Sequence, residues 1–205
     1  CMLIQSMDLL QQDLAPMSGN ASQELARIHY EASRLNTNLM QLLSLYRIER
    51  DQLPLHLDEY FVEDLLEEVL IKNEMYSQQK QIQVTVESEP QLSWFFDNDL
   101  VSNLLNDMFV NALRYSAGKL LLKASTIEQQ LCLELHDDGE GFPDYMLENS
   151  DHSMMHFNLT AGRTGLGLFF AHLIAKAHRN HGRCGRIELC NGGQFGGGVF
   201  RLYLP

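Results

Sequence analysis

The sequence predicts an α+β protein whose main part is a two-layer α/β sandwich, preceded by an antiparallel helical hairpin. In several long segments, apolar residues recur every three or four positions, which is the spacing of a helix that buries one face. Other segments, such as residues 82–88, alternate apolar and polar residues and are rich in β-branched side chains, as strands are. The segments do not follow one another strictly as strand, helix and strand, so a doubly wound parallel sheet is not expected.

Residues 1–53 read as two helices. Apolar residues fall at helical spacing in residues 1–14, the segment APMSGN at 15–20 interrupts the pattern, and a second amphipathic stretch follows. Two helices joined by a short turn form a hairpin that cannot bury its apolar stripe alone. We therefore expect a second copy to complete a four-helix bundle, although packing on the following domain would also cover the stripe.

The pattern changes after Pro54, so a second domain is expected at residues 54–205. In its first helix, the spacing of apolar residues turns Phe61, Leu65 and Leu66 toward the core. The expected elements are a helix at 58–80, a strand at 82–88, a helix at 98–116, a pair of strands within 118–139, an irregular loop at 139–161, a helix at 165–178, a basic loop at 178–186 and two closing strands.

The net charge of −12 argues against a general electrostatic attraction to nucleic acid or to an anionic membrane. A small polyanion such as a nucleotide can still bind, because a few backbone N–H groups and a Mg²⁺ ion are enough to hold it. The four cysteines form no C-x-x-C pair and no zinc pattern, as in a cytosolic protein with reduced thiols. No uninterrupted apolar segment is as long as the roughly 18 residues that a helix needs to span a bilayer. We expect a cytoplasmic fragment of a longer polypeptide, with no membrane contact of its own.

Asp107 and Asn111 lie four residues apart in the helix expected at 98–116, so they share one helical face. A carboxamide on an otherwise apolar helix needs hydrogen-bond partners if it is buried. Its oxygen can also ligate a Mg²⁺ ion that bridges phosphates. Bonding of both side chains to local backbone or to solvent explains the pair equally well.

Asp137 ends a strand in the segment LHDDGEGFP, and Gly139 and Gly141 follow it closely. An Asp at a strand end can accept a hydrogen bond from the exocyclic amine of adenine, and glycines let the backbone lie close to a flat ring. An ordinary Asp-Gly turn is the alternative.

The segment GRTGLGL at 162–168 places flexible backbone at the start of a helix. The N–H groups there lack helical partners and the helix dipole adds positive potential, so the segment can bind phosphate. Alternatively, it is only the flexible entry to a buried helix. The glycine-rich segment GGQFGGGVF at 192–200 is expected to be a turn that lets the sheet close.

The order of these motifs resembles the ATP-binding domain of sensor histidine kinases, which is grouped with the gyrase and mismatch-repair ATPases. The resemblance covers residues 55–205 and rests on the Asn helix, the Asp-Gly-x-Gly strand end, a variable loop, the Gly-x-Gly-x helix and the glycine-rich final hairpin. The hairpin at 1–53 resembles the dimerisation and phosphotransfer domain of the same kinases. The segment LLSLYRIERDQLPL at 42–55 resembles the end of that domain and its linker.

The resemblance implies ATP and Mg²⁺ as cofactors and assigns roles to individual residues. Asn111 would ligate Mg²⁺, Asp137 would bind adenine, and residues 144–161 would form a lid over the nucleotide. The other nucleotide-binding residues that it implies are Arg114 near phosphate, Tyr115 against the ring, Gly139 and Gly141 at the base pocket, and Thr164, Gly165, Leu166 and Gly167 around the phosphates.

Asp107 departs from the family pattern, because sensor kinases often have Asn at this position whereas related ATPases have a carboxylate. It is the candidate catalytic residue, which would polarise an attacking group or bind a metal-bound water. Residues 1–20 lack the His and acidic pair that receives the phosphoryl group, and the first His is His29, which we interpret as a packed or solvated helix residue. The fragment is therefore expected to bind nucleotide without autophosphorylation.

The function implied is that of a protein histidine kinase in two-component signalling. It would transfer the γ-phosphoryl of ATP to a histidine absent from this chain, and then to the receiver domain of a response regulator, as a homodimer held by the hairpin. The alternative is a non-catalytic ATP-binding regulatory module that binds another kinase or a receiver domain. A third option, supported only by Asp107, is an ATP-hydrolysing member of the wider family.

Overall fold

The computed structural model describes residues 55–147 and 166–205. The chain divides into two compact units between Pro54 and Leu55. The fold below is that of the second unit, residues 55–205. The predicted helical hairpin at 1–53 and most of the predicted lid at 144–161 lie outside the described residues. Their roles stay predictions.

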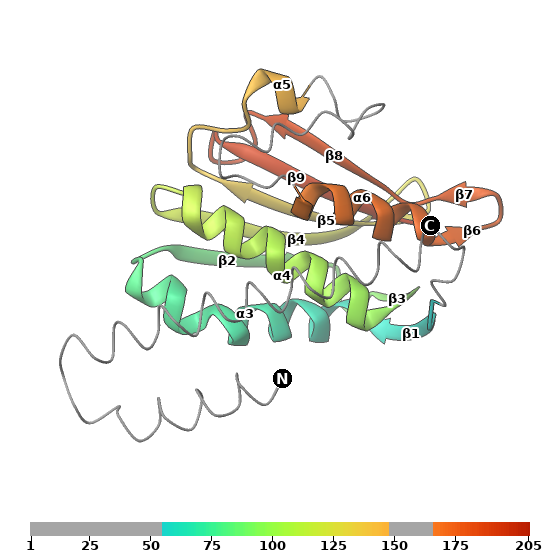
Figure 1. The fold of residues 1–205 in the computed structure, drawn as a ribbon. Coiled ribbons are helices and arrows are strands. Elements are labelled where there is room, and N and C mark those ends of the chain that lie inside the picture. The colour runs from blue at the N-terminus through green and yellow to red at the C-terminus, as the bar shows by residue number, and fades with distance from the viewer. Residues whose placement is uncertain (1–54, 148–165) are drawn as a thin grey trace. The chain divides into compact units, whose positions relative to one another are not determined.

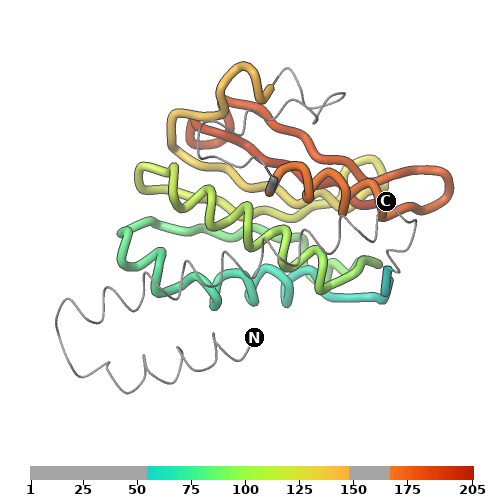
Figure 2. Tube along the Cα trace, in the orientation of Figure 1, coloured from blue at the N-terminus to red at the C-terminus, as the bar shows by residue number. Residues whose placement is uncertain are grey.

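A five-stranded mixed sheet forms one layer of the domain (Figures 1 and 2). The first pair in the sheet, β2 with β4, is parallel, and every other pair is antiparallel. This mixture fits the expected absence of strict alternation in the sequence. In spatial order the strands are β2 (Gln83–Ser88), β4 (Lys119–Ile127), β5 (Gln130–Asp137), β9 (Gly198–Leu204) and β8 (Arg186–Asn191).

Three helices, α3 (Val62–Gln79), α4 (Asn98–Tyr115) and α6 (Leu166–Ala177), form the second layer on one face of the sheet (Figure 1). Because strand side chains alternate between faces, every second residue of β5 and β9 points at these helices. The core contains Leu131, Leu133 and Leu135 from β5 and Phe200, Leu202 and Leu204 from β9. Burial of each such side chain contributes about 2 kcal/mol of hydrophobic free energy. The predicted two-layer α/β sandwich is confirmed.

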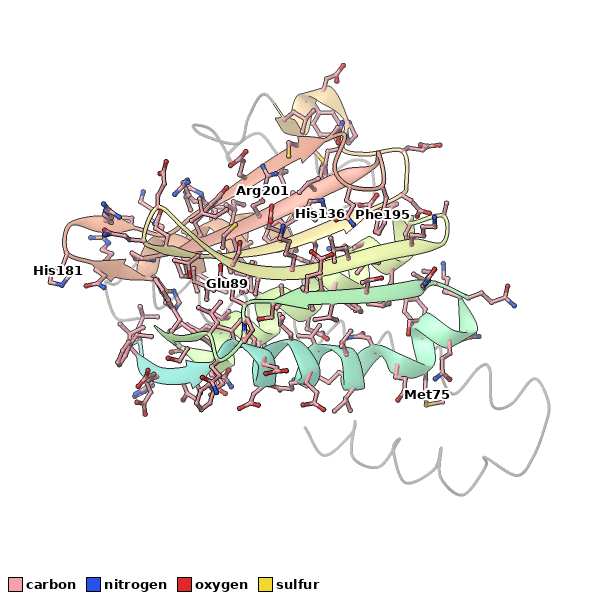
Figure 3. The ribbon with its side chains drawn as sticks, turned by 180° about the vertical axis from the view of Figure 1, so that it is seen from behind. Met75, Glu89, His136, His181, Phe195 and Arg201 are labelled. Carbon is pink, nitrogen blue, oxygen red and sulfur yellow. The ribbon has the colours of Figure 1, made fainter. Side chains whose placement is uncertain are left out.

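The intervening residues of β5 and β9 form the opposite, polar face of the sheet, where Figure 3 shows His136 and Arg201. The guanidinium Nε of Arg201 donates to Oε1 of Glu134 at 2.6 Å, and its Nη1 donates to Oε1 of Glu188 at 3.1 Å. No described helix covers this face, so the polar residues there pair with one another across strands.

The first predicted helix begins four residues later than expected, because residues 58–61 form a strand. This strand, β1 (Asp58–Phe61), pairs antiparallel with β3 (Ser93–Phe96), and the rings of Tyr60 and Phe96 lie 5.4 Å apart. Phe61 precedes the helix and is 57% exposed, so its predicted inward position was wrong. Leu65 and Leu66 are buried as expected.

The predicted basic loop at 178–186 contains a small hairpin instead, formed by β6 (Arg179–Asn180) and β7 (Arg183–Cys184). Its turn residues, His181 and Gly182, both have positive φ angles of 45° and 80°, which matches the twist of a two-residue hairpin. His181 lies at the outer tip (Figure 3). None of the described helices is long and apolar enough to cross a membrane.

Candidate nucleotide-binding site

Three of the predicted motifs meet at one end of the described domain, where α4, the end of β5 and the start of α6 come together. Gly167, in the first turn of α6, packs against α4. A Cβ atom added at Gly167 would lie 3.3 Å from Cε of Met108 and 4.0 Å from Nδ2 of Asn111. Because glycine has no side chain, the backbone at Gly167 can approach the face of α4 that carries Asn111.

Asp137 is held in place by backbone N–H groups from two segments. Its Oδ1 accepts hydrogen bonds from Gly139 at 2.8 Å and from Gly198 at 3.0 Å. Among the described residues, no hydrogen bond reaches Oδ2. A carboxylate oriented in this way keeps one oxygen as an acceptor for a ligand, and the bond to Gly139 is the local Asx turn that Asp favours.

The two glycines that follow Asp137 are required by close backbone approaches. A Cβ atom at Gly139 would lie 2.3 Å from the carbonyl oxygen of Tyr115, the last residue of α4. Gly141 has a φ of +82°, which L side chains rarely adopt, and its Cβ would lie 2.6 Å from Oδ1 of Asn191. These contacts explain why glycine stands at both positions, and their part in shaping a base pocket stays a prediction.

The final glycine-rich segment does more than close the sheet, because it contacts Asp137. A Cβ atom at Gly197 would lie 2.5 Å from both the backbone oxygen and Oδ1 of Asp137, and one at Gly198 would lie 2.9 Å from Oδ2. From its sequence, this segment is predicted only to be a turn. The signal that could have indicated more is the run of three glycines directly before an apolar strand.

Asp138 also has a role at this end of the domain that its sequence pattern does not predict. Its Oδ1 accepts the backbone N–H groups of Ala117 at 2.7 Å and Gly118 at 3.0 Å. Partial burial acts to raise the pKa of the Asp138 carboxyl, but backbone hydrogen bonds, led by that of Gly118, outweigh it and hold the pKa below its usual value. The carboxylate thus fastens the connection between α4 and β4 to the end of β5.

Asp107 and Asn111 occupy successive turns of α4 with different exposure. Asp107 is half-buried, and burial raises the pKa of its carboxyl to about 7. The side chain of Asn111 is exposed, so the expectation that a buried amide needs protein partners does not apply to it. An exposed amide beside the first turn of α6 is instead accessible to a ligand.

The remaining predicted residues are placed only in part. Arg114 and Tyr115 are exposed at the end of α4, and Tyr115 is 50% exposed. Leu166 begins α6, and only its backbone is described. Thr164 and Gly165 lie outside the described residues.

The donor set on α4 fits Mg²⁺ held jointly by protein and phosphate. Within residues 55–147 and 166–205, no group of three or more His, Cys, Asp or Glu residues could hold a metal ion. Mg²⁺ usually takes one or two protein oxygens together with substrate phosphates and water. The exposed Asn111 amide can supply one such oxygen, with Asp107 one helical turn away.

Comparison of the sequence with known proteins gives a family and a relative. Residues 96–205 match the sequence profile described as histidine kinase-, DNA gyrase B- and HSP90-like ATPase. The chain is 24% identical over 165 residues to sensor protein SrrB of Staphylococcus aureus (strain NCTC 8325 / PS 47), covering 76% of this chain and 28% of SrrB. It thus spans little more than a quarter of that relative's length.

Solved structures of histidine kinases share the fold. Acinetobacter baumannii histidine kinase AdeS superposes with a TM-score of 0.68 at 22% identity, over 99% of this chain and 93% of AdeS. The catalytic domain of histidine kinase ThkA gives a TM-score of 0.61 at 20% identity, over 73% of this chain and 95% of that domain. The cytoplasmic segment of histidine kinase QseC gives 0.56 at 23% identity, over 84% and 93% of the two chains.

The predicted resemblance is therefore confirmed at the level of the family. The matched profile covers more than half of the chain and includes α4, the end of β5, α6 and the final hairpin. The protein belongs to the family of histidine kinase-, DNA gyrase B- and HSP90-like ATPases.

Proposed function

We propose that the chain is the ATP-binding catalytic portion of a two-component sensor histidine kinase. The observation that supports this most directly is the environment of Asp137. Two backbone N–H groups occupy its Oδ1, and Oδ2 accepts no hydrogen bond within the described part of the chain. An acceptor oriented by the fold and surrounded by glycine backbone suits the exocyclic amine of adenine.

On the base side of the proposed site, Asp137 accepts the adenine amine and the Tyr115 ring packs against the base. The exposed position of Tyr115 at the end of α4 supports this role, since its own backbone contacts Gly139. Gly139 and Gly141 keep the backbone close to the plane of the ring.

On the phosphate side, the backbone N–H groups of Leu166 and Gly167 at the start of α6 bind the triphosphate. Thr164 and Gly165, which lie outside the described residues, are proposed to bind it too. Arg114 adds a positive charge. Asn111 would hold Mg²⁺ through its amide oxygen, which would bring positive charge to the phosphates. The proximity of Gly167 to Asn111 supports one site made from both motifs.

The proposed reaction transfers the γ-phosphoryl to a histidine, and then to a response-regulator receiver domain, chiefly through positioning and electrostatics. Asp107 is the proposed catalytic residue, because a carboxyl with a pKa of about 7 can exchange a proton at neutral pH. Dimerisation through residues 1–53, a cytoplasmic location and the receiver-domain partner belong to the same proposal.

Nucleotide titration of the Asp137→Asn variant tests the adenine assignment. The change leaves the size of the side chain but gives it an amide that can point an N–H group at the adenine amine, so we expect ATP to bind at least about tenfold more weakly. Asp99→Asn is the matched control, because it removes the same charge from an exposed position in the first turn of α4. Equal affinities of wild type and Asp137→Asn for ATP would contradict the assignment.

The alternative, a non-catalytic ATP-binding regulatory module, shares the binding site and differs in the chemistry. A dimerisation domain that contains an acceptor histidine, supplied as a separate protein, distinguishes the two. Phosphorylation of that histidine from labelled ATP supports the kinase. Nucleotide binding without phosphoryl transfer supports the module.

A further inference from the structure

Asn191, the last residue of β8, makes two hydrogen bonds to a single residue of the turn that follows Asp137. Its Oδ1 accepts the backbone N–H of Phe142 at 2.7 Å, and its Nδ2 donates to the Phe142 carbonyl at 2.8 Å. A side-chain amide that pairs with both backbone groups of one residue acts as an additional strand partner. It joins two segments that are 49 residues apart in the sequence.

The same asparagine is connected to the Asp137 carboxylate through the sheet. Asn191 is the cross-strand partner of Gly198, and the Gly198 N–H donates to Oδ1 of Asp137 at 3.0 Å. The Phe142 ring lies against Gly198, because a Cβ atom added there would meet the ring at 3.1 Å. Asn191, Phe142 and Gly198 therefore form a closed ring of contacts, and the Gly198 N–H joins this ring to Asp137.

The path of the turn between Asp137 and Phe142 depends on this amide. Gly141 has a φ of +82°, and its Cβ would lie 2.6 Å from Oδ1 of Asn191, so the backbone lies directly against the amide. The short helix α5 (Asp144–Leu147), which follows the turn, also contacts β8. Loss of the amide would release one side of the turn while the bond from Gly139 to Asp137 remains local.

We propose that Asn191 is a positioning residue of the adenine site, an inference that rests on the proposed ATP-binding function. By holding Phe142 against Gly198, it fixes the far end of the turn after Asp137 and the Gly198 N–H that orients the Asp137 carboxylate. Asn191 acts through the turn and does not contact the nucleotide itself. Its loss weakens recognition of the base and leaves binding of the phosphates unchanged.

Titration of the full chain with ADP and with GDP, each with Mg²⁺, tests the inference in wild type and in Asn191→Ala. The two ligands share their phosphates and differ in the base. We expect ADP to bind Asn191→Ala about tenfold more weakly, while GDP affinity stays the same, so that the preference for ADP falls. A general loss of folding would weaken the binding of ADP and GDP alike. Asn180→Ala is the matched control, since Asn180 is exposed in β6 and its side chain makes no hydrogen bond within the described residues.

Each outcome has a defined meaning. An unchanged ADP affinity in Asn191→Ala, or equal weakening of ADP and GDP, overturns the positioning role while the proposed function stands. Wild-type protein that binds neither nucleotide overturns the proposed function and this inference with it. If Asn191→Ala does not fold, the same titrations are made with Asn191→Asp. This variant keeps the size of the side chain and replaces the Nδ2 donor with an acceptor oxygen. An unchanged preference for ADP in that variant also overturns the inference.

Discussion

His178 accepts the backbone N–H of Asp97 through Nε2 at 3.1 Å, and its Nδ1 lies 2.7 Å from the carbonyl oxygen of Ile174. Because a carbonyl can only accept, Nδ1 carries the proton and Nε2 is unprotonated, so the imidazole is neutral. Asp97 in turn caps α4, accepting the N–H of Leu100 at 3.1 Å through Oδ1 and that of His56 at 2.9 Å through Oδ2. The buried His178 thereby joins the end of α6 to the start of α4.

Acidification should weaken this junction. Burial, the largest cause, lowers the pKa of His178 below its usual value, against smaller opposing effects of Ile174 and Asp97. The unfolded chain therefore binds a proton more readily than the folded protein. The stabilisation is fully present above the ordinary His pKa of about 6.5 and is lost as the pH falls through the lower folded value.

Urea unfolding at several pH values between about 8 and 5 checks this expectation. In His178→Gln, which cannot titrate, the free energy of unfolding should fall less on acidification than in wild type. His181→Gln is the control, because His181 lies exposed at the tip of the β6–β7 hairpin (Figure 3). A His178→Gln variant with the full wild-type pH dependence would contradict the prediction.

Asp107 should lower the stability of the protein at alkaline pH. Its pKa is raised to about 7 by burial, so the folded state holds the proton more tightly than the unfolded state. The contribution of Asp107 to the free energy of unfolding therefore falls as the pH rises from the pKa of Asp107 in the unfolded chain to about 7, its pKa in the folded protein. Above that pH the contribution stays low. We expect Asp107→Asn to be more stable than wild type by about 2 kcal/mol at pH 8, after allowance for partial solvent screening, with little gain at pH 4.

Unfolding of Asp107→Asn and wild type at these two pH values provides the measurement, with Asp99→Asn as the charge-matched control. The same variant should lose phosphoryl transfer if Asp107 is catalytic. A stability gain without any loss of phosphoryl transfer would contradict the catalytic role of Asp107. Phosphate release from ATP that disappears in Asp107→Asn would instead favour ATP hydrolysis.

Gly139→Ala should destabilise the domain, because the new Cβ would lie 2.3 Å from the Tyr115 carbonyl oxygen. Both groups belong to or adjoin the backbone, so the strain must shift the end of α4 or the turn, at a cost of about 2–3 kcal/mol. Gly118→Ala is the control, since its Cβ would lie 3.9 Å from Oδ2 of Asp138, which is an ordinary van der Waals contact. Equal denaturation midpoints for the two variants would contradict the close contact at Gly139.

The sequence by itself determined the family of the protein. It also determined those helices and strands whose apolar residues recur at a clear period. The helices at α3, α4 and α6 and the strands of the main sheet follow from local alternation of apolar residues, which depends on neighbours a few positions away. The short strand β1 was missed because four residues carry too little of a period. Its pairing with β3 depends on residues more than 30 positions away in the chain, such as Phe96 beside Tyr60.

The order of motifs also named Asp137, Gly139 and Gly141 in advance, whereas the contacts around them needed the tertiary structure. Asn191 is 49 residues from Phe142, and Gly198 is 61 residues from Asp137. Nothing in a local pattern marks an asparagine at the end of an edge strand as the partner of a distant turn. Only the antiparallel closure of β8 and β9 on β5 brings these groups within hydrogen-bond distance, because contact across a sheet is decided by register and not by sequence separation.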